Sequence, residues 1–172
     1  MKNKLSFIPG DLVSTNSTPL GTKNGVIYRI ISVDPTDILE SLDGKTILKE
    51  VTVHIENTGN IKPGDKGYIY TDYVCAWVCD LLPIPLTKTI LEDNGWNKSK
   101  HVVDEDDFEW IEYHNSNFDD LILQYYPTHN NFSLFYYDEE MLQIDYVHQL
   151  QHVLFSFGYD HYLEVQDEKV VY

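Results

Sequence analysis

Residues 82–87 have the sequence Leu-Pro-Ile-Pro-Leu-Thr, and they divide the chain into two unlike halves. Alternating prolines hold the backbone extended and disfavour helix in the residues before them. The sequence before this stretch is rich in β-branched residues and Gly/Pro turns, whereas a helix signal follows it at once. We therefore predict one domain at 1–82, a proline-rich hinge at 83–87 and a second domain at 88–172.

The residues after the hinge predict a short helix. Thr87 is a favoured N-cap residue, and Leu86 and Leu91 stand at the spacing of a hydrophobic staple. Gly95 suits the left-handed position that follows a helix, where Trp96 would pack back on Leu91. The second domain therefore begins with a helix that has both of its ends marked in the sequence.

The first half predicts a small all-β domain. Runs rich in Val, Ile and Tyr alternate with turn clusters. After a first strand at 12–13, the predicted strands are 26–33, 51–55, 68–70 and 74–82. Because so few strands would leave exposed edges in an open sheet, we predict that they close into a small SH3-like β-barrel.

The two cysteines, Cys75 and Cys79, fall in the last of these predicted strands. Four residues of strand separate two Cα atoms by about 13 Å. A disulfide needs Cα atoms within about 7 Å. Valine and aromatic neighbours indicate a packed strand, so we predict two buried thiols and no disulfide.

The second half predicts an α-β-β-β-α module, which makes the whole chain a mixed α+β protein. Residues 98–107 are polar and predict a loop. Three strand-like runs separated by turn formers predict an antiparallel meander: 108–114, 121–126 and 132–137. Residues 162–165 could add a last short strand.

A second helix is predicted after the meander, with Asp145 as its N-cap and Gly158 as its end. The residues between them place apolar side chains on one helix face: Val147, Leu150, Leu154 and Phe157.

Negative charge is concentrated in the second half. The chain has a net charge of −16, and residues 87–172 carry 18 acidic and four basic side chains. A polyanion would be repelled at long range, so direct nucleic-acid binding is disfavoured, whereas a basic protein or a metal cation would be attracted. Solubility alone is the alternative explanation of this excess.

Two segments resemble markers of a known family. Residues 83–87 have the sequence Pro-Ile-Pro-Leu-Thr, with Ile-Leu at 90–91 and Asn-Gly-Trp at 94–96, and residues 146–151 have the sequence Tyr-Val-His-Gln-Leu-Gln. Together they resemble a family of Bacteroidetes phage and mobile-element proteins with a PIPLT…ILxxxGF/W segment and a C-terminal YVHQLQ helix. The resemblance implies such an origin and a shared plan over residues 80–165, and it implies no particular chemistry.

Two histidines provide the one metal-like pattern in the sequence. His148 and His152 would share a helix face, and two imidazoles at this spacing can hold zinc, to which Asp145 could add a carboxylate. A zincin-type peptidase would need Glu at position 149, where this chain has Gln149, which cannot act as a general base. The alternative is that His148 packs at the edge of the apolar stripe, and we predict no metal and no cofactor.

Tyrosine and amide side chains complete the candidates. Neighbouring strand residues point to opposite faces, so one tyrosine of each pair should face away from the core; we select Tyr126 and Tyr137, because tyrosine among acidic residues is common at protein interfaces. Packing under a helix is the alternative. Gln151 could bind a peptide backbone or a base edge, or it satisfies carbonyls of neighbouring strands. The predicted binding residues are thus Tyr126, Tyr137, Asp145, His148, Gln151 and His152.

The sequence holds no catalytic set, since no Ser-His-Asp or Cys-His arrangement and no Gly-rich phosphate loop can be identified. We predict a non-catalytic phage or mobile-element accessory protein that binds a host or phage protein. Without an apolar signal or spanning segment, the expected location is the bacterial cytoplasm, with no membrane partner. One alternative is an inhibitor of bacterial defence that mimics nucleic acid or sequesters a small ligand, and the other is a metal-dependent enzyme using His148 and His152. The oligomeric state stays open.

Overall fold

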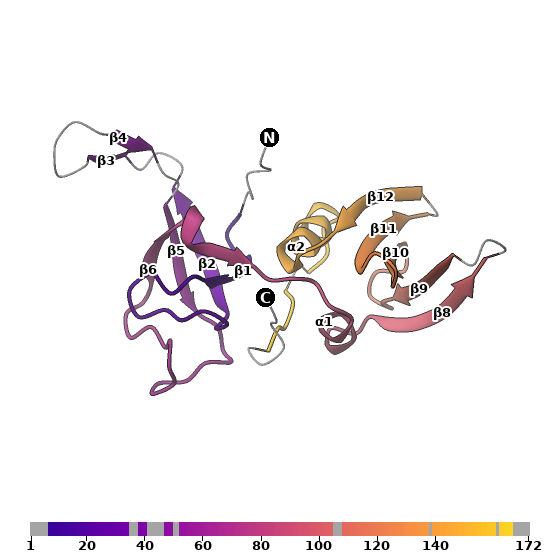
Figure 1. The fold of residues 1–172 in the computed structure, drawn as a ribbon, viewed down its shortest axis with the longest axis horizontal. Coiled ribbons are helices and arrows are strands. Elements are labelled where there is room, and N and C mark those ends of the chain that lie inside the picture. Colours follow the sequence, from indigo (N-terminus) through magenta and orange to yellow (C-terminus); the bar gives the residue numbers. More distant parts are fainter. Residues whose placement is uncertain are drawn as a thin grey trace. The chain divides into compact units, whose positions relative to one another are not determined.

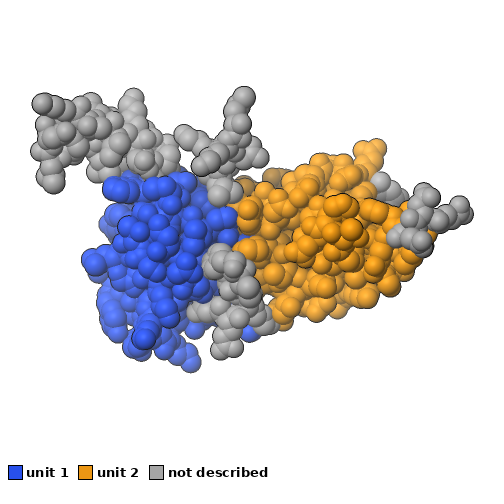
Figure 2. Space-filling view, in the orientation of Figure 1, with its two compact units in different colours: residues 1–84, 166–172 blue, residues 85–165 orange. Residues whose placement is uncertain are grey.

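The computed structural model describes residues 7–34, 38–40, 47–49, 52–104, 108–137, 139–160 and 162–166. The chain forms two compact units, coloured separately in Figure 2: residues 1–84 with 166–172, and residues 85–165. In the described ranges the protein is mostly β, with two five-stranded antiparallel sheets and two short helices. That each unit folds as an independent domain stays a prediction.

The first unit is built on a sheet with the strand order β6-β5-β2-β1-β7 (Figure 1). Its strands are β1 (Leu12–Thr15), β2 (Tyr28–Asp34), β5 (Thr52–Asn57), β6 (Val74–Trp77) and β7 (Leu81–Pro83). A separate hairpin pairs β3 (Ile38–Glu40) with β4 (Ile47–Lys49), and the sequence pattern did not indicate it.

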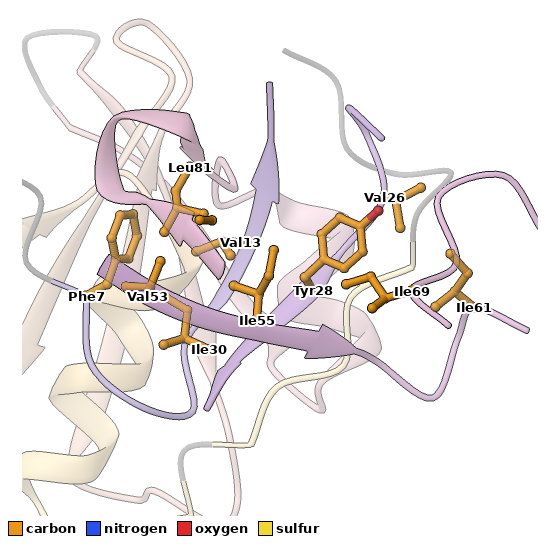
Figure 3. Packing of buried hydrophobic residues seen from close by; sticks show 11 residues of the cluster. Phe7, Val13, Val26, Tyr28, Ile30, Val53, Ile55, Ile61, Ile69 and Leu81 are labelled. Atoms are coloured by element: carbon orange, nitrogen blue, oxygen red, sulfur yellow. The ribbon is translucent and has the colours of Figure 1, made fainter. Parts of the chain in front are cut away.

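Inward-facing residues of these strands build the core of the first unit, which Figure 3 shows from close by. Val13 and Ile55 are completely buried apolar members. Tyr28 is buried with them and anchors a loop through its hydroxyl, which donates to the Gly67 carbonyl at 2.8 Å and accepts from the Lys23 N–H at 2.9 Å. The core therefore extends beyond the sheet to the turns around residue 67.

The predicted closed barrel is not found among the described residues. Strands β6 and β7 are the two edges of the sheet, and no strand pairing joins them. A single 3-10 turn, η1 (Val78–Asp80), connects them. Three residues of 3-10 helix rise only about 6 Å, so the end of β6 and the start of β7 lie close together although the two strands do not pair. Asn16 holds this turn, because its N–H donates to the Asp80 carbonyl at 3.0 Å and its Nδ2 to the Asp80 Oδ1 at 2.9 Å.

Two local predictions for this half are wrong. The predicted strand around Ile69 is a loop, held by the Asn57 side chain, which accepts from the Ile69 N–H at 2.9 Å and donates to its carbonyl at 2.7 Å. Cys75 and Cys79 are exposed and not buried. The reason is that Ala76 takes the inward position of β6 and that Cys79 lies in the η1 turn.

The second unit is a five-stranded antiparallel meander with the order β12-β11-β10-β9-β8 and two helices (Figure 1). Its strands are β8 (Asn97–Val103), β9 (Glu109–His114), β10 (Leu121–Tyr126), β11 (Asn131–Tyr136) and β12 (Glu139–Ile144). The three predicted strands correspond to β9, β10 and β11. The predicted α-β-β-β-α order therefore lacked both edge strands.

Both missed strands are polar in sequence. Much of the predicted loop at 98–107 is β8, which pairs along β9 from Asn97 opposite His114 onward. The acidic residues Glu139 and Glu140 begin β12. Backbone pairing at a sheet edge needs no apolar side chain, and charged residues on an edge strand disfavour aggregation. Residues 162–165 form no strand.

Helix α1 (Lys88–Asp93) has the predicted caps. The Thr87 hydroxyl accepts a hydrogen bond from the Ile90 N–H at 3.2 Å. Gly95 follows with φ +80°, and the Trp96 N–H donates to the Leu91 carbonyl at 3.0 Å, which is a Schellman ending. The Trp96 side chain is completely buried, so this helix end is also a packing site.

Helix α2 (Val147–Ser156) begins one residue later than predicted, because its N-cap is Tyr146 and not Asp145. The Gln149 Oε1 accepts from the N–H groups of Asp145 at 2.7 Å and Tyr146 at 3.0 Å. The predicted end holds, since Gly158 has φ +77°. None of the helices in the described ranges has the length and apolar character that a membrane span requires.

Candidate binding site

The sheet of the second unit has one face covered by helices and one open face. Leu121, Leu123 and Tyr125 of β10 are buried on the covered face, where the Lys88 Nζ of α1 lies 4.8 Å from the centre of the Tyr125 ring. Figure 1 shows α1 and α2 on the same side of this sheet. Strand geometry turns the intervening side chains to the opposite side, which no described element of the second unit covers.

The strand register defines which side chains form the open face. It consists of Trp110, Glu112, His114, Ile122, Gln124, Tyr126, Asn131, Ser133, Phe135, Glu140 and Gln143, with Asn97, Lys100 and Val102 of β8 at its edge. The face thus combines aromatic rings with amide and carboxyl groups. Trp110 and Glu112 are themselves linked, because the indole Nε1 donates to the Glu112 Oε1 at 3.1 Å.

Tyr126 lies on this open face, as the alternation in its strand predicted. Its hydroxyl donates to the Gln124 Oε1 at 2.7 Å. Burial raises the pKa of Tyr126, and the negative charges of Glu140 and Glu112 raise it further. Two carboxylates from different strands therefore act on the same aromatic side chain.

A depression of about 330 Å³ is hollowed into one part of the open face. It is lined by Phe108, Tyr126, His129, Asn131, Ser133, Glu140 and Gln143. Phe108 is 41% exposed and lies near three other rings. Its ring centroid is 5.5 Å from that of Tyr126, 6.3 Å from that of Trp110 and 6.4 Å from that of His129. Apart from Tyr126, none of the residues that line the depression was predicted from the sequence.

The other predicted residues do not join Tyr126. His148 and Gln151 are each only 2% exposed, so these two side chains belong to the interior of the second unit. The His148 ring stacks on Tyr146 with centroids 5.8 Å apart and meets His152 at 5.6 Å. Asp145 is exposed at the start of α2, where its Oδ1 accepts from the Gln143 Nε2 at 2.6 Å.

The arrangement around the two histidines does not form a metal centre. In the part of the chain that the structure describes, no three His, Cys, Asp or Glu side chains are grouped so that they could hold an ion. Asp145, the predicted third ligand, is bonded to Gln143 instead. His152 lies at a second depression, of about 310 Å³, between α2 and β12, with Met141, Leu142 and Phe157 among its lining residues.

Tyr137 stands apart from both groups. It follows β11 with a left-handed backbone, φ +46°, and it is 64% exposed. A hydrogen bond to Asp120 and the charge of that carboxylate raise the pKa of Tyr137 to about 12. Its position is therefore fixed by a turn contact, and it lies outside the depression that contains Tyr126.

Neither the family models nor the curated proteins and solved structures contain a match to this chain. Over the residues that the structure describes, the class is a mostly-β protein with two five-stranded antiparallel sheets and two short helices. The resemblance to Bacteroidetes phage and mobile-element proteins stays a prediction.

One sequence signal could have found more of the open face. Residues that alternate with the apolar covered-face positions of β9, β10 and β11 are Trp110, Glu112, Gln124, Tyr126, Asn131 and Ser133. Trp110 and Tyr126 among them are large aromatic side chains, which a solvent-exposed face does not need. Glu140 and Gln143 carried no such signal, because β12 was not predicted.

Proposed function

We propose that this chain is a non-catalytic binding protein whose second unit holds a positively charged protein partner on its open face. The observation that carries the proposal is an uncovered sheet face that bears Trp110, Phe135 and Tyr126 next to carboxylates. Aromatic side chains without a covering helix are typical of protein interfaces. The excess of acidic residues in the second half would steer a basic partner toward it.

The resemblance supports an accessory role in a phage or mobile element, with a host or phage protein as the partner. The order of the five strands in the first unit, with a 3-10 turn between β6 and β7, also supports an SH3-like fold for that unit. We propose that the first unit is an incompletely closed member of this fold class and serves as a separate module.

The test is retention of a defined class of partner by the immobilised full chain. We expect the chain to retain a basic protein from a lysate of Bacteroidetes cells at low salt and to release it as salt rises, since the Debye length falls from about 10 Å at 0.1 M to about 3 Å at 1 M. Changing Glu112 and Glu140 of the open face to Gln should abolish retention. The matched control changes Glu139 and Glu164, which lie outside that face, to Gln and should leave retention intact.

Equal retention by the two double variants would contradict the proposed face. Inhibition of a defence protein by nucleic-acid mimicry is the second candidate, and it draws on the same negative charge. Competition separates the two: double-stranded DNA should displace a mimicked enzyme from the chain and should not displace a partner bound through the aromatic face.

A further inference from the structure

We propose that the depression on the open face is a pocket for a single arginine side chain of the protein partner. The inference rests on the proposed function. It adds the chemical group of the partner that the open face would bind, which is a guanidinium. The depression, at about 330 Å³, stands at the lower end of the range of ligand pockets. Its size suits one side-chain head better than a whole cofactor.

The aromatic wall suits a flat cation. Phe108 and Tyr126 meet at an interplanar angle of 41° with centroids 5.5 Å apart, and both line the depression. Aromatic faces attract cations within about 6 Å of the ring centroid. A guanidinium is planar, so it can stack on such a ring while its edge stays available for hydrogen bonds.

Three of the polar groups in the depression can accept hydrogen bonds from a ligand. Glu140 supplies a carboxylate at the wall. The Gln143 Oε1 is an acceptor, while its Nε2 donates to Asp145, and the Tyr126 hydroxyl oxygen can accept because its proton is donated to Gln124. Glu140, Gln143 and Tyr126 can therefore accept hydrogen bonds from a ligand that only donates.

Asn131 adds a specific requirement for a donor. Its Oδ1 is a buried atom that accepts no hydrogen bond from the described protein groups. A buried acceptor is unfavourable unless a donor reaches it. A guanidinium carries five N–H donors in a fixed plane and has no acceptor, so it can donate to Glu140 directly, and to Asn131 once the Asn131 side chain turns toward the depression.

Charge excludes the opposite class of ligand. No lysine or arginine lines the depression, and Glu140 and Glu112 both act on Tyr126. A carboxylate or phosphate would be repelled by these carboxylates, with no lysine or arginine in the lining to offset the repulsion. The lysine ammonium remains a weaker competitor, because it is a compact and strongly hydrated charge that cannot stack.

The experiment measures binding of short capped peptides to the full chain by NMR titration. The probe is Gly-Ser-Arg-Ser-Gly, compared with the same peptide carrying lysine or citrulline, the neutral isostere of arginine. We expect the citrulline peptide to bind about tenfold more weakly or worse, since it loses the charged hydrogen bonds. The lysine peptide should fall between the two.

Two variants locate the site. Glu140→Gln should weaken arginine-peptide binding about tenfold, and Phe108→Leu should weaken it while keeping an apolar side chain in place. Glu139→Gln is the control, because it removes the same charge one residue away, opposite Tyr136 of the covered face, and should leave affinity within about twofold. The amide spectrum of each variant verifies its fold.

Equal affinity for arginine and citrulline would overturn the pocket. Equal effects of Glu140→Gln and Glu139→Gln would also overturn it, because binding would then follow net charge alone. In either case, a basic partner retained by the full chain and lost on the open-face double variant would leave the proposed function standing. The proposed function would instead be contradicted if the arginine peptide bound as expected but the full chain retained no basic protein, or if the open-face double variant retained it equally well.

Discussion

Gly67 is a residue at which the first unit requires the absence of a side chain. Its φ is +92°, a backbone conformation that residues with a Cβ rarely adopt. A Cβ at this position would lie 2.8 Å from the Lys23 Cβ and 2.9 Å from the Tyr28 hydroxyl oxygen. The same hydroxyl bonds the Gly67 carbonyl, so the two groups cannot separate without loss of that bond.

We expect Gly67→Ala to lower the free energy of unfolding by about 2 kcal/mol more than Gly64→Ala, because overpacking adds to backbone strain. Gly64 is the matched control, since its φ is +100° and no atom lies within 4 Å of its Cβ position. Urea denaturation followed by tryptophan fluorescence gives both values. Equal losses in the two variants would mean that the contact with Tyr28 carries no strain.

The candidate residues show where sequence reasoning about single side chains succeeds. Tyr126 was placed on the correct side of its strand, because alternation follows from backbone geometry alone. His148 and Gln151 were selected as candidate binding residues, with packing inside the protein as the alternative, and both are buried. The helix pattern gave their spacing correctly, but how wide a stripe of a helix is buried depends on what packs against it.

Helix α1 is the element whose limits the sequence determines most completely. The Thr87 hydroxyl caps its first turn, and the glycine after the helix permits the Schellman bonds that close its last one. Such short helices form only with strong end signals, because few internal hydrogen bonds offset the cost of nucleation.

We expect Thr87→Ala to destabilise the protein by about 1 kcal/mol, since the Ile90 N–H would lose the Thr87 hydroxyl as its hydrogen-bond acceptor. Thr89→Ala is the control: Thr89 is an exposed residue within α1, and alanine favours helix there. Chemical denaturation at constant pH measures both changes. A loss of the same size at Thr89 would contradict a capping role for Thr87.

The edge strands β8 and β12 mark the limit of pattern reasoning at the level of elements. Residues of β8 are mostly exposed and show no apolar alternation. Their strand conformation is stabilised by backbone bonds to β9, a partner that comes later in the sequence. In β12, Met141 is an extra residue, because Leu142 pairs with Leu134 and Glu140 pairs with Phe135. This register shift interrupts the regular alternation of side chains along the strand.

At the scale of the whole molecule, the chain divides into two units at residues 84 and 85, inside the predicted hinge at 83–87. Each unit has its own sheet and its own buried residues. Compact units of this size with a separate core are able to fold alone.

We expect a fragment of residues 85–165 to unfold cooperatively on its own, with the near-ultraviolet signal of buried Trp96 and Tyr113 retained. Circular dichroism and urea denaturation of the fragment provide the measurement. The full chain should show the same transition for this unit within about 1 kcal/mol, since distant sites contribute nearly additively. A fragment without tertiary signals would contradict the prediction of two independent domains.

The sequence by itself determined the division at the prolines, the caps of α1, the three central strands of the second unit and the concentration of negative charge. Each of these depends on local backbone preferences or on composition, which neighbours in the chain are sufficient to define. Only the tertiary structure decided that the first sheet stays open, that two polar segments become edge strands, and that Phe108, Asn131 and Glu140 meet Tyr126 in one depression. Those outcomes depend on contacts between residues far apart in sequence, whose free energies no local pattern encodes.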